Sequence, residues 1–299
     1  MNAIKPFVMV TALVLGFSST LWSQANLLNA RVPQEVGQLN EAQLAANDEA
    51  PLAYGYIDDR DVLWSKTVWE LIDLKERINF PYYYPTDTLN LGSDRRSLFD
   101  VLLRDIKKGK IKEIYSDGYF LNKITQDDIL DKLVLIDTSD AGYTQMNENG
   151  FVDPQFITPY SITSNEIEQY RIKGTWYFNK RLGEMRYRLL AICPLAFDLR
   201  SKIKLNQEEL VELFWVWFPD ARQSLNKNKV FNSRNSSQPI TYDAMLNARR
   251  FNSIIYKEEN IYEDRQVKDY IFEDALRQLL ESERIKATIR DFEQDMWNN

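Results

Sequence analysis

The chain has 299 residues, with 37 Lys or Arg against 44 Asp or Glu, so its formal net charge is −7. This acidic balance argues against nucleic acid or an anionic membrane surface as the main partner. The sequence contains no histidine and one cysteine, which excludes Cys/His zinc sites, the common catalytic triads and an intramolecular disulfide.

Residues 1–23 have the pattern of a signal peptide, because Lys5 precedes an apolar run over residues 7–17 that small polar residues end. A membrane anchor is the alternative, but the run is shorter than the ~20 residues of a spanning helix. We therefore expect export and cleavage near Gln24. The only cysteine, Cys193, lies far downstream, so no lipid-acceptor cysteine follows the cleavage site. Any membrane attachment must come through a partner.

Residues 24–52 are rich in Asn, Gln and Ala and contain no aromatic residue. This composition is typical of an extended arm. Two interpretations remain open. The arm is either a flexible leader or a segment that becomes ordered on a neighbouring subunit, an option kept open by its scattered apolar residues.

Residues 53–136 are predicted to form a helix-rich first half. A first helix is expected over residues 63–78, because Trp64, Val68, Ile72 and other apolar residues recur at helical spacing. A second helix of about fifteen residues is expected to begin near Ser93 or Asp94 and to end at residues 107–109. Two short strands in residues 111–121 and a third helix, capped by Thr125 and ending at Leu133, complete this half. Residues 137–165 are expected to be a loop and a hinge.

Residues 166–299 are predicted to be β-rich, with a long C-terminal helix. Runs at 167–178 and 185–192 predict a hairpin, and residues 213–218 and 251–256 predict further strands. Thr241 is expected to cap a helix that reaches about residue 250. The last helix, over 269–297, carries two apolar stripes that differ in phase, as expected if it covers two surfaces. The predicted class is α+β, with helices packed on short, mainly antiparallel strands, in one domain or two.

Known catalytic signatures are missing from the sequence. It has no dinucleotide, phosphate-loop or nucleophile-elbow motif. The adjacent acids at 127–128, 208–209 and 258–259 are candidates for a glycosidase pair, although such neighbours usually lie on a solvated face. Cys193 lies in the apolar stretch LLAICPLAF, which indicates a buried residue rather than a reactive thiol. We therefore predict no catalytic, cofactor-binding or metal-binding residue and no cofactor.

The candidate functional residues are instead those of a protein interface. The Tyr trio between two prolines is either a turn packed on the first helix or an amphipathic contact surface. Two Arg pairs are either solvated or salt-bridging interface anchors. The candidates are Tyr82, Tyr83, Tyr84, Arg95, Arg96, Arg249 and Arg250.

Extended blocks of the chain resemble the GldN family, called PorN in species that do not glide. The resemblance rests on TVWE at 67–70, ERINFPYYYPTD at 76–87 and GSDRRSLFDVLL at 92–103. It also rests on LFWVWFPDAR at 213–222 and ARRFNSIIYKEENIYEDRQVKDYI at 248–271.

The resemblance implies a non-enzymatic structural component of the type IX protein secretion system of Bacteroidetes, which supports gliding motility where the organism glides. It implies a periplasmic ring formed by copies of the chain and an outer-membrane lipoprotein of the GldK/PorK type, which tethers it to that membrane. It further implies contact with a periplasmic shaft protein of the GldM/PorM type, and no direct membrane insertion. The alternatives are a monomeric envelope glycan hydrolase that uses two carboxylates, and a periplasmic binding protein or chaperone.

Overall fold

The computed structural model describes residues 51–87, 95–205, 207–230, 240–272 and 274–298. The predicted signal peptide, residues 24–50 of the predicted arm, and the expected caps Ser93 and Asp94 lie outside these residues. The described part of the chain has the predicted α+β class, with antiparallel strands and a long C-terminal helix.

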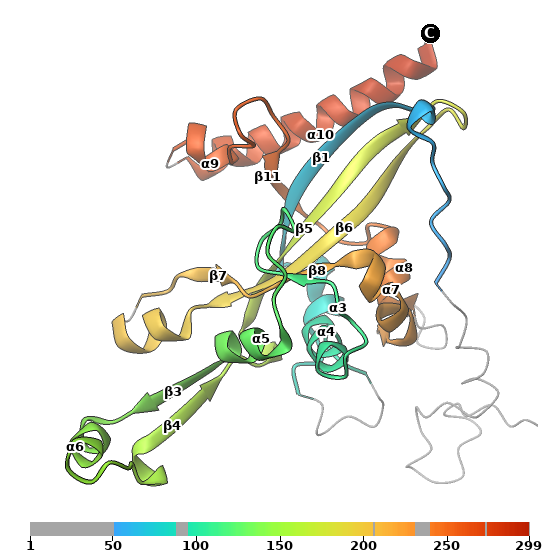
Figure 1. Ribbon diagram of the computed structural model, residues 1–299. Helices are drawn as coiled ribbons and strands as arrows, with labels where there is room; N and C mark the ends of the chain where they lie inside the picture. The colour runs from blue at the N-terminus through green and yellow to red at the C-terminus, as the bar shows by residue number, and fades with distance from the viewer. Residues whose placement is uncertain (1–50, 88–94, 206, 231–239, 273, 299) are drawn as a thin grey trace, which may run out of the picture. The chain divides into compact units, whose positions relative to one another are not determined.

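One antiparallel sheet of seven strands organises the fold, in the order β11-β1-β5-β6-β8-β2, with β7 paired to β6 (Figure 1). Its first and last strands in sequence are neighbours, so the segments predicted as two halves share a single sheet. The strands are β1 (Val62–Asp73), β2 (Ile114–Tyr115), β5 (Ile167–Asn179), β6 (Glu184–Phe197), β7 (Leu210–Glu212), β8 (Trp215–Trp217) and β11 (Ile254–Glu258).

The predicted first helix over 63–78 is wrong, because this segment is the long central strand β1. β1 pairs along one edge with β5 and along the other with β11. Val68 and Trp69 point to opposite faces by strand alternation, and both are buried. A strand covered on both faces loses the apolar–polar alternation that identifies a half-exposed strand. Its apolar residues therefore fell at spacings that imitate a helix.

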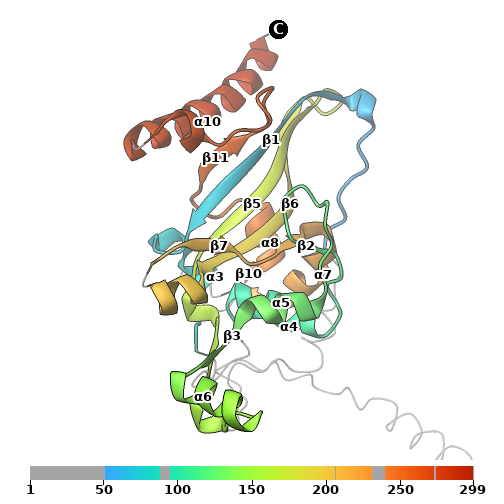
Figure 2. The same ribbon diagram turned by 60° about the vertical axis from the view of Figure 1, so that its left-hand side comes forward.

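Two groups of helices cover one face of the sheet. The first, with α3 (Phe80–Tyr83), α4 (Leu98–Lys107), α7 (Phe218–Lys227) and α8 (Tyr242–Asn247), packs over one end in the largest apolar cluster. The second, with α9 (Val267–Tyr270) and α10 (Ala275–Asn298), lies along β11 and β1 (Figures 1 and 2). Ile285 and Ile289, in the last predicted helix, are buried there. Phe292 stacks on Trp64, with 4.7 Å between the ring centroids.

Several local predictions are confirmed. The β5–β6 hairpin turns through Gly183, whose φ of +66° suits glycine. Helix α5 (Gln126–Leu133) begins with the predicted capping box, in which Thr125 and Asp128 each bond the other's backbone N–H. Helix α8 begins at the predicted cap, Thr241. Helix α4 carries its predicted apolar stripe but begins later than expected, with Ser97 as its cap.

The prediction of a loop over 137–165 is wrong. This segment holds most of a two-stranded ribbon, β3 (Val134–Thr138) paired with β4 (Ile157–Ser161), and helix α6 (Asp140–Asn149) between them. Polar residues and glycines usually mark loops. Here Ser139 and Gly150 instead cap the two ends of α6.

The boundaries of three further elements differ from the predictions. The expected strand at 213–218 is limited to β8, because Phe218 begins α7 with Pro219 in its first turn. The expected strand at 251–256 is shifted to β11, and the last predicted helix is divided into α9 and α10. The short elements are β9 (Lys229–Val230), β10 (Ile240–Thr241), a π turn (Ser201–Leu205) and the 3-10 turns Asp59–Asp61, Arg77–Asn79, Pro154–Phe156 and Ser164–Glu166.

Candidate protein-binding surface

Tyr82, the first member of the tyrosine trio, belongs to the core. Its side chain is fully buried, and its hydroxyl donates a hydrogen bond to the carbonyl of Arg250 at 3.3 Å. Its ring packs near those of Tyr242 and Phe251. Burial raises the pKa of the Tyr82 phenol well above its usual range. Tyr82 is therefore unavailable to a partner, which corrects its assignment to the candidate interface.

Arg249 is also committed to the interior. Its guanidinium donates two hydrogen bonds to the carboxylate of Glu70, at 2.9 and 2.7 Å, and Glu70 on β1 is completely buried. The same guanidinium lies over the rings of Tyr187 and Trp176, with centroid distances of 4.2 and 5.1 Å. Arg249 thus neutralises a charge inside the sheet, and its assignment as an interface anchor is not supported by this placement.

The remaining arginines lie nearer the surface. Arg96 forms an ion pair with Asp100 at 2.8 Å, one turn further along the chain, and Arg95 beside it is partly buried. Arg250 is exposed. An ion pair at this degree of exposure contributes little stability. The three arginines stay candidates for an interface.

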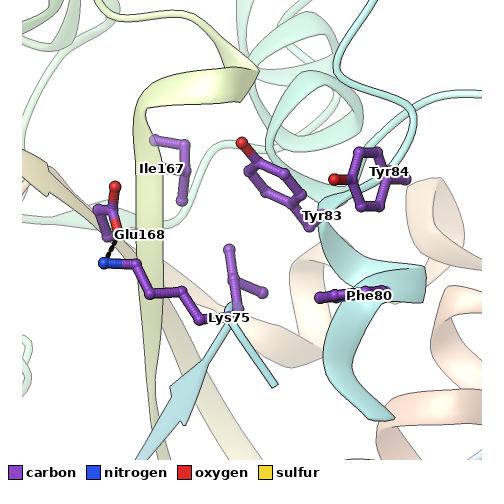
Figure 3. Close-up of a pocket in the computed structure, with 7 residues that line it drawn as sticks. Lys75, Phe80, Tyr83, Tyr84, Ile167 and Glu168 are labelled. Carbon is purple, nitrogen blue, oxygen red and sulfur yellow. Dashed lines mark ion pairs between the residues drawn. The ribbon is translucent and has the colours of Figure 1, made fainter. Parts of the chain in front are cut away.

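Tyr83 and Tyr84 line a shallow pocket of about 270 Å³ beside α3, together with Phe80, Leu74 and Ile167. Figure 3 shows the rings of Phe80, Tyr83 and Tyr84 on one side of this pocket and Ile167 on the other. Tyr84 makes edge contacts with both other rings, at centroid distances of 4.8 and 5.6 Å, yet half of its surface is exposed. Exposed aromatic rings held in place by each other are typical of protein-contact surfaces.

A charged pair forms the polar wall of this aromatic pocket. Lys75 and Glu168 lie 2.8 Å apart, and the dashed line in Figure 3 marks this ion pair. The hydrogen bond to Glu168 raises the pKa of the Lys75 amine above its usual value. The Tyr83 hydroxyl donates to the carbonyl of Asn165 at 3.1 Å. The pocket therefore offers an apolar floor with a polar edge, which suits a protein side chain better than a fully apolar ligand.

A second aromatic cluster, on the opposite face of the sheet, was missed by sequence reasoning. Lys173 on β5 lies over the rings of Trp69, Tyr119 and Phe120, with centroid distances of 4.7 to 5.1 Å. Its amine donates to the carbonyl of Gly118 at 2.9 Å. Lys257, on β11, also lies over Trp69 and Tyr119. These contacts hold the turn after β2 against the sheet. The residues lie far apart in the sequence, so the sequence alone did not indicate that they are close in space.

Replacing Lys173 with methionine is expected to change how stability depends on pH. Burial, and then the nearby Lys257 charge, lower the pKa of Lys173. Between this lowered pKa and the ordinary value of about 10.4, the folded chain binds fewer protons than the unfolded chain, so stability rises with pH. As the pH rises through this range, the free energy of unfolding of the native chain should therefore increase relative to that of Lys173→Met. Urea unfolding of both proteins at pH 8, 9 and 10 tests this, and a constant difference would contradict it.

The acids proposed for a glycosidase pair have ordinary structural positions. Asp128 belongs to the capping box of α5, and Glu258 forms an ion pair with Lys66 at 2.7 Å. Glu208 and Glu209 are exposed. Among the described residues, no group of three or more Cys, Asp or Glu side chains could hold a metal ion. In the same residues, no helix combines the length and the hydropathy that crossing a bilayer requires.

Two comparisons place the chain among known sequences. A search of curated proteins finds no sequence that matches the chain. A family model matches residues 57–298; it is described as gliding motility associated protein GldN. These residues include nearly all of the described part of the chain, with the aromatic pocket and the candidate arginines. The resemblance carried by the aromatic turn and the arginine-containing blocks is thus one part of a similarity over the whole fold, and the chain belongs to the GldN family.

Proposed function

We propose that the chain, which its membership of the GldN family makes a component of the gliding-motility and type IX secretion machinery, is a non-enzymatic structural component. It forms a periplasmic ring with an outer-membrane lipoprotein of the GldK/PorK type. The observation that carries this proposal is the family match over residues 57–298. Contact with a shaft protein of the GldM/PorM type belongs to the same proposal, as does attachment to the outer membrane through the lipoprotein.

The aromatic pocket is our proposed contact with the lipoprotein. Tyr84 and Phe80 are the exposed aromatic members. Tyr83, held by its bond to Asn165, contacts the ring of Tyr84, which in turn contacts Phe80. Rings already held in place lose little conformational entropy when a partner binds. The backbone carbonyls of Arg96 and Arg250 accept hydrogen bonds from the hydroxyls of Tyr242 and Tyr82. Tyr82 belongs to α3, as Tyr83 does, so both arginines lie in the same part of the fold as the aromatic pocket.

Capture of the assembly from native membranes tests the proposed function. The full chain would carry an affinity tag, and the captured complex would be measured by light scattering and mass spectrometry. We expect a large assembly that contains the lipoprotein and several copies of the chain. A monomer without the lipoprotein would contradict the proposal and favour a glycan hydrolase or a binding protein. Loss of secretion after replacing one carboxylate, with the assembly intact, would favour the hydrolase.

Replacing Phe80 and Tyr84 together with serine is expected to reduce capture of the lipoprotein at least tenfold. Central aromatic anchors contribute about 1–2 kcal/mol or more each, and about 1.4 kcal/mol corresponds to a factor of ten. Quantitative mass spectrometry of the captured lipoprotein measures this effect. The control replaces Tyr56 and Leu182, two exposed apolar residues outside the pocket, and should leave capture unchanged. Equal losses in both variants would show that the pocket has no special role.

A further inference from the structure

The β3–β4 ribbon is an isolated pair of strands. In the described part of the chain, β3 and β4 pair only with each other, so each has an unpaired outer edge. The ribbon joins the main core at its base, where Ile162 is buried and its N–H donates to the carbonyl of Leu133 at 2.8 Å. Figures 1 and 2 both draw α6 at the end of the ribbon that is remote from the seven-stranded sheet. Two strands alone are only marginally stable in water, and unpaired edges favour association.

The ribbon and α6 also expose several large apolar side chains. Ile136, within β3, is 64% exposed, and Phe151, between α6 and β4, is 57% exposed. The far end has its own packing, since Gly142 lies tightly against Val152 and Phe156. Exposed apolar groups on a packed, ordered unit indicate a surface that another protein covers. The exposed members are Val134, Ile136, Tyr143, Met146, Phe151 and Tyr160.

The charges of the ribbon have one sign. Residues 134–161 contain Asp137, Asp140, Glu148 and Asp153 and neither Lys nor Arg. Asp153 is engaged by Gln145, whose amide donates to it at 2.8 Å, whereas Asp140 and Glu148 are exposed. The surface that covers this ribbon should therefore be basic as well as apolar.

A basic surface exists at the end of α4. Residues 104–112 contain five Lys or Arg and a single acid. Lys107, Lys108, Lys110 and Lys112 are exposed. Arg104 donates to Asn228 at 2.8 Å, which places Lys227 and Lys229 close to the same end of the helix. In a chain of net charge −7, this basic segment and the acidic ribbon are complementary.

We propose that the β3–α6–β4 ribbon of one copy of the chain docks on the basic end of α4 of a second copy. This inference rests on the proposed ring and assigns its copy-to-copy contact. The two surfaces are different parts of the chain, so one copy can use its ribbon on one neighbour and its α4 end on another. Such head-to-tail contacts are the kind that generate rings.

Charge reversal in full-length chains tests the contact. One variant carries Asp137→Lys and Glu148→Lys on the ribbon, and a second carries Lys108→Glu and Lys112→Glu at the α4 end. Copies with two different affinity tags are expressed together in the native cell, one tag is captured, and the other copy and the lipoprotein are quantified. Copies of either variant should capture each other at least tenfold less than native copies do. A ribbon variant mixed with an α4 variant should recover capture, because the reversed charges again attract.

Two further measurements make the outcome decisive. Asp59→Lys with Asp291→Lys is the matched control for the ribbon variant, since both acids are exposed, lie outside the ribbon and give the same change in net charge as that variant; it should leave capture unchanged. Circular dichroism checks that each variant is folded. Unchanged capture by both variants, or no recovery in the mixture, would overturn the contact. So would a ribbon variant that loses only the lipoprotein, which would make the lipoprotein the occupant. If native copies capture neither each other nor the lipoprotein, the proposed function itself fails.

Discussion

Arg249→Ala is expected to lower the free energy of unfolding by about 3–5 kcal/mol, the usual effect of removing one partner of a buried ion pair. Glu70 is fully buried and receives two hydrogen bonds from Arg249. Ser253 also donates to this carboxylate, but a hydroxyl cannot neutralise its charge. The variant would leave the carboxylate of Glu70 uncompensated on β1, between the largest apolar cluster and the α10 cluster. Urea unfolding, followed by circular dichroism, measures the loss.

Two variants separate the ion pair from the other roles of Arg249. Arg284→Ala removes an exposed arginine that pairs with Glu281 at 2.6 Å, and it should cost less than about 1 kcal/mol. Arg249→Lys keeps the positive charge but loses the two-pronged geometry, so it should fall between these values. Similar losses for Arg249→Ala and Arg284→Ala would refute the argument. The backbone of Arg249 has a φ of +50°, a conformation that glycine adopts more readily, and Arg249→Gly should therefore be less damaging than Arg249→Ala.

Local signals in the sequence predicted the structure correctly where residues that are close together in the sequence determine it. The capping box of α5 depends on Thr125 and Asp128, which are three residues apart. The hairpin between β5 and β6 depends on one glycine with a positive φ. These features need no contact from distant parts of the chain. They were predicted correctly for this reason.

Long-range contacts decided the features that the sequence did not show. β1 is a strand because β5 and β11, more than 90 residues away in sequence, cover its two edges. An apolar pattern that fits two faces cannot distinguish a buried strand from a helix. The ribbon at 134–161 was missed for a related reason. Its polar residues form helix caps, and within the described residues its strands pair only with each other.

The candidate interface stays a prediction, but the structure separates its buried residues from those nearer the surface. Tyr83 and Tyr84 line the pocket, whereas Tyr82, their neighbour, turns into the core. Three consecutive residues in a helical turn point in different directions, and composition alone cannot tell which one is buried. Arg249 and Arg250 divide in the same way, one paired with Glu70 and one exposed. Adjacent residues of one type therefore had to be assigned one at a time.

Gly174→Ala is expected to be nearly as damaging as the loss of Arg249, through a steric effect. Gly174 lies in the centre of β5, between Val68 and Leu189 in the sheet register. A Cβ atom at this position would lie 2.1 Å from the Tyr187 hydroxyl oxygen and 2.2 Å from the ring carbon that bears it. The Tyr187 ring cannot move away freely, because it packs against Trp176 and Arg249. Displacing it would also disturb the ion pair with Glu70.

Overpacking of this kind costs about 1–3 kcal/mol or more, and the coupling to the ion pair should place Gly174→Ala at the upper end. Gly55→Ala is the matched control, since no atom lies within 4 Å of its added Cβ, and its effect should stay within about 0.5 kcal/mol. Thermal and urea unfolding of the two variants gives the comparison. Adding Tyr187→Ala to Gly174→Ala removes the clashing ring, so the double variant should lose less stability than the sum of the single changes. Additive losses would show that the glycine is not required by the approach of Tyr187.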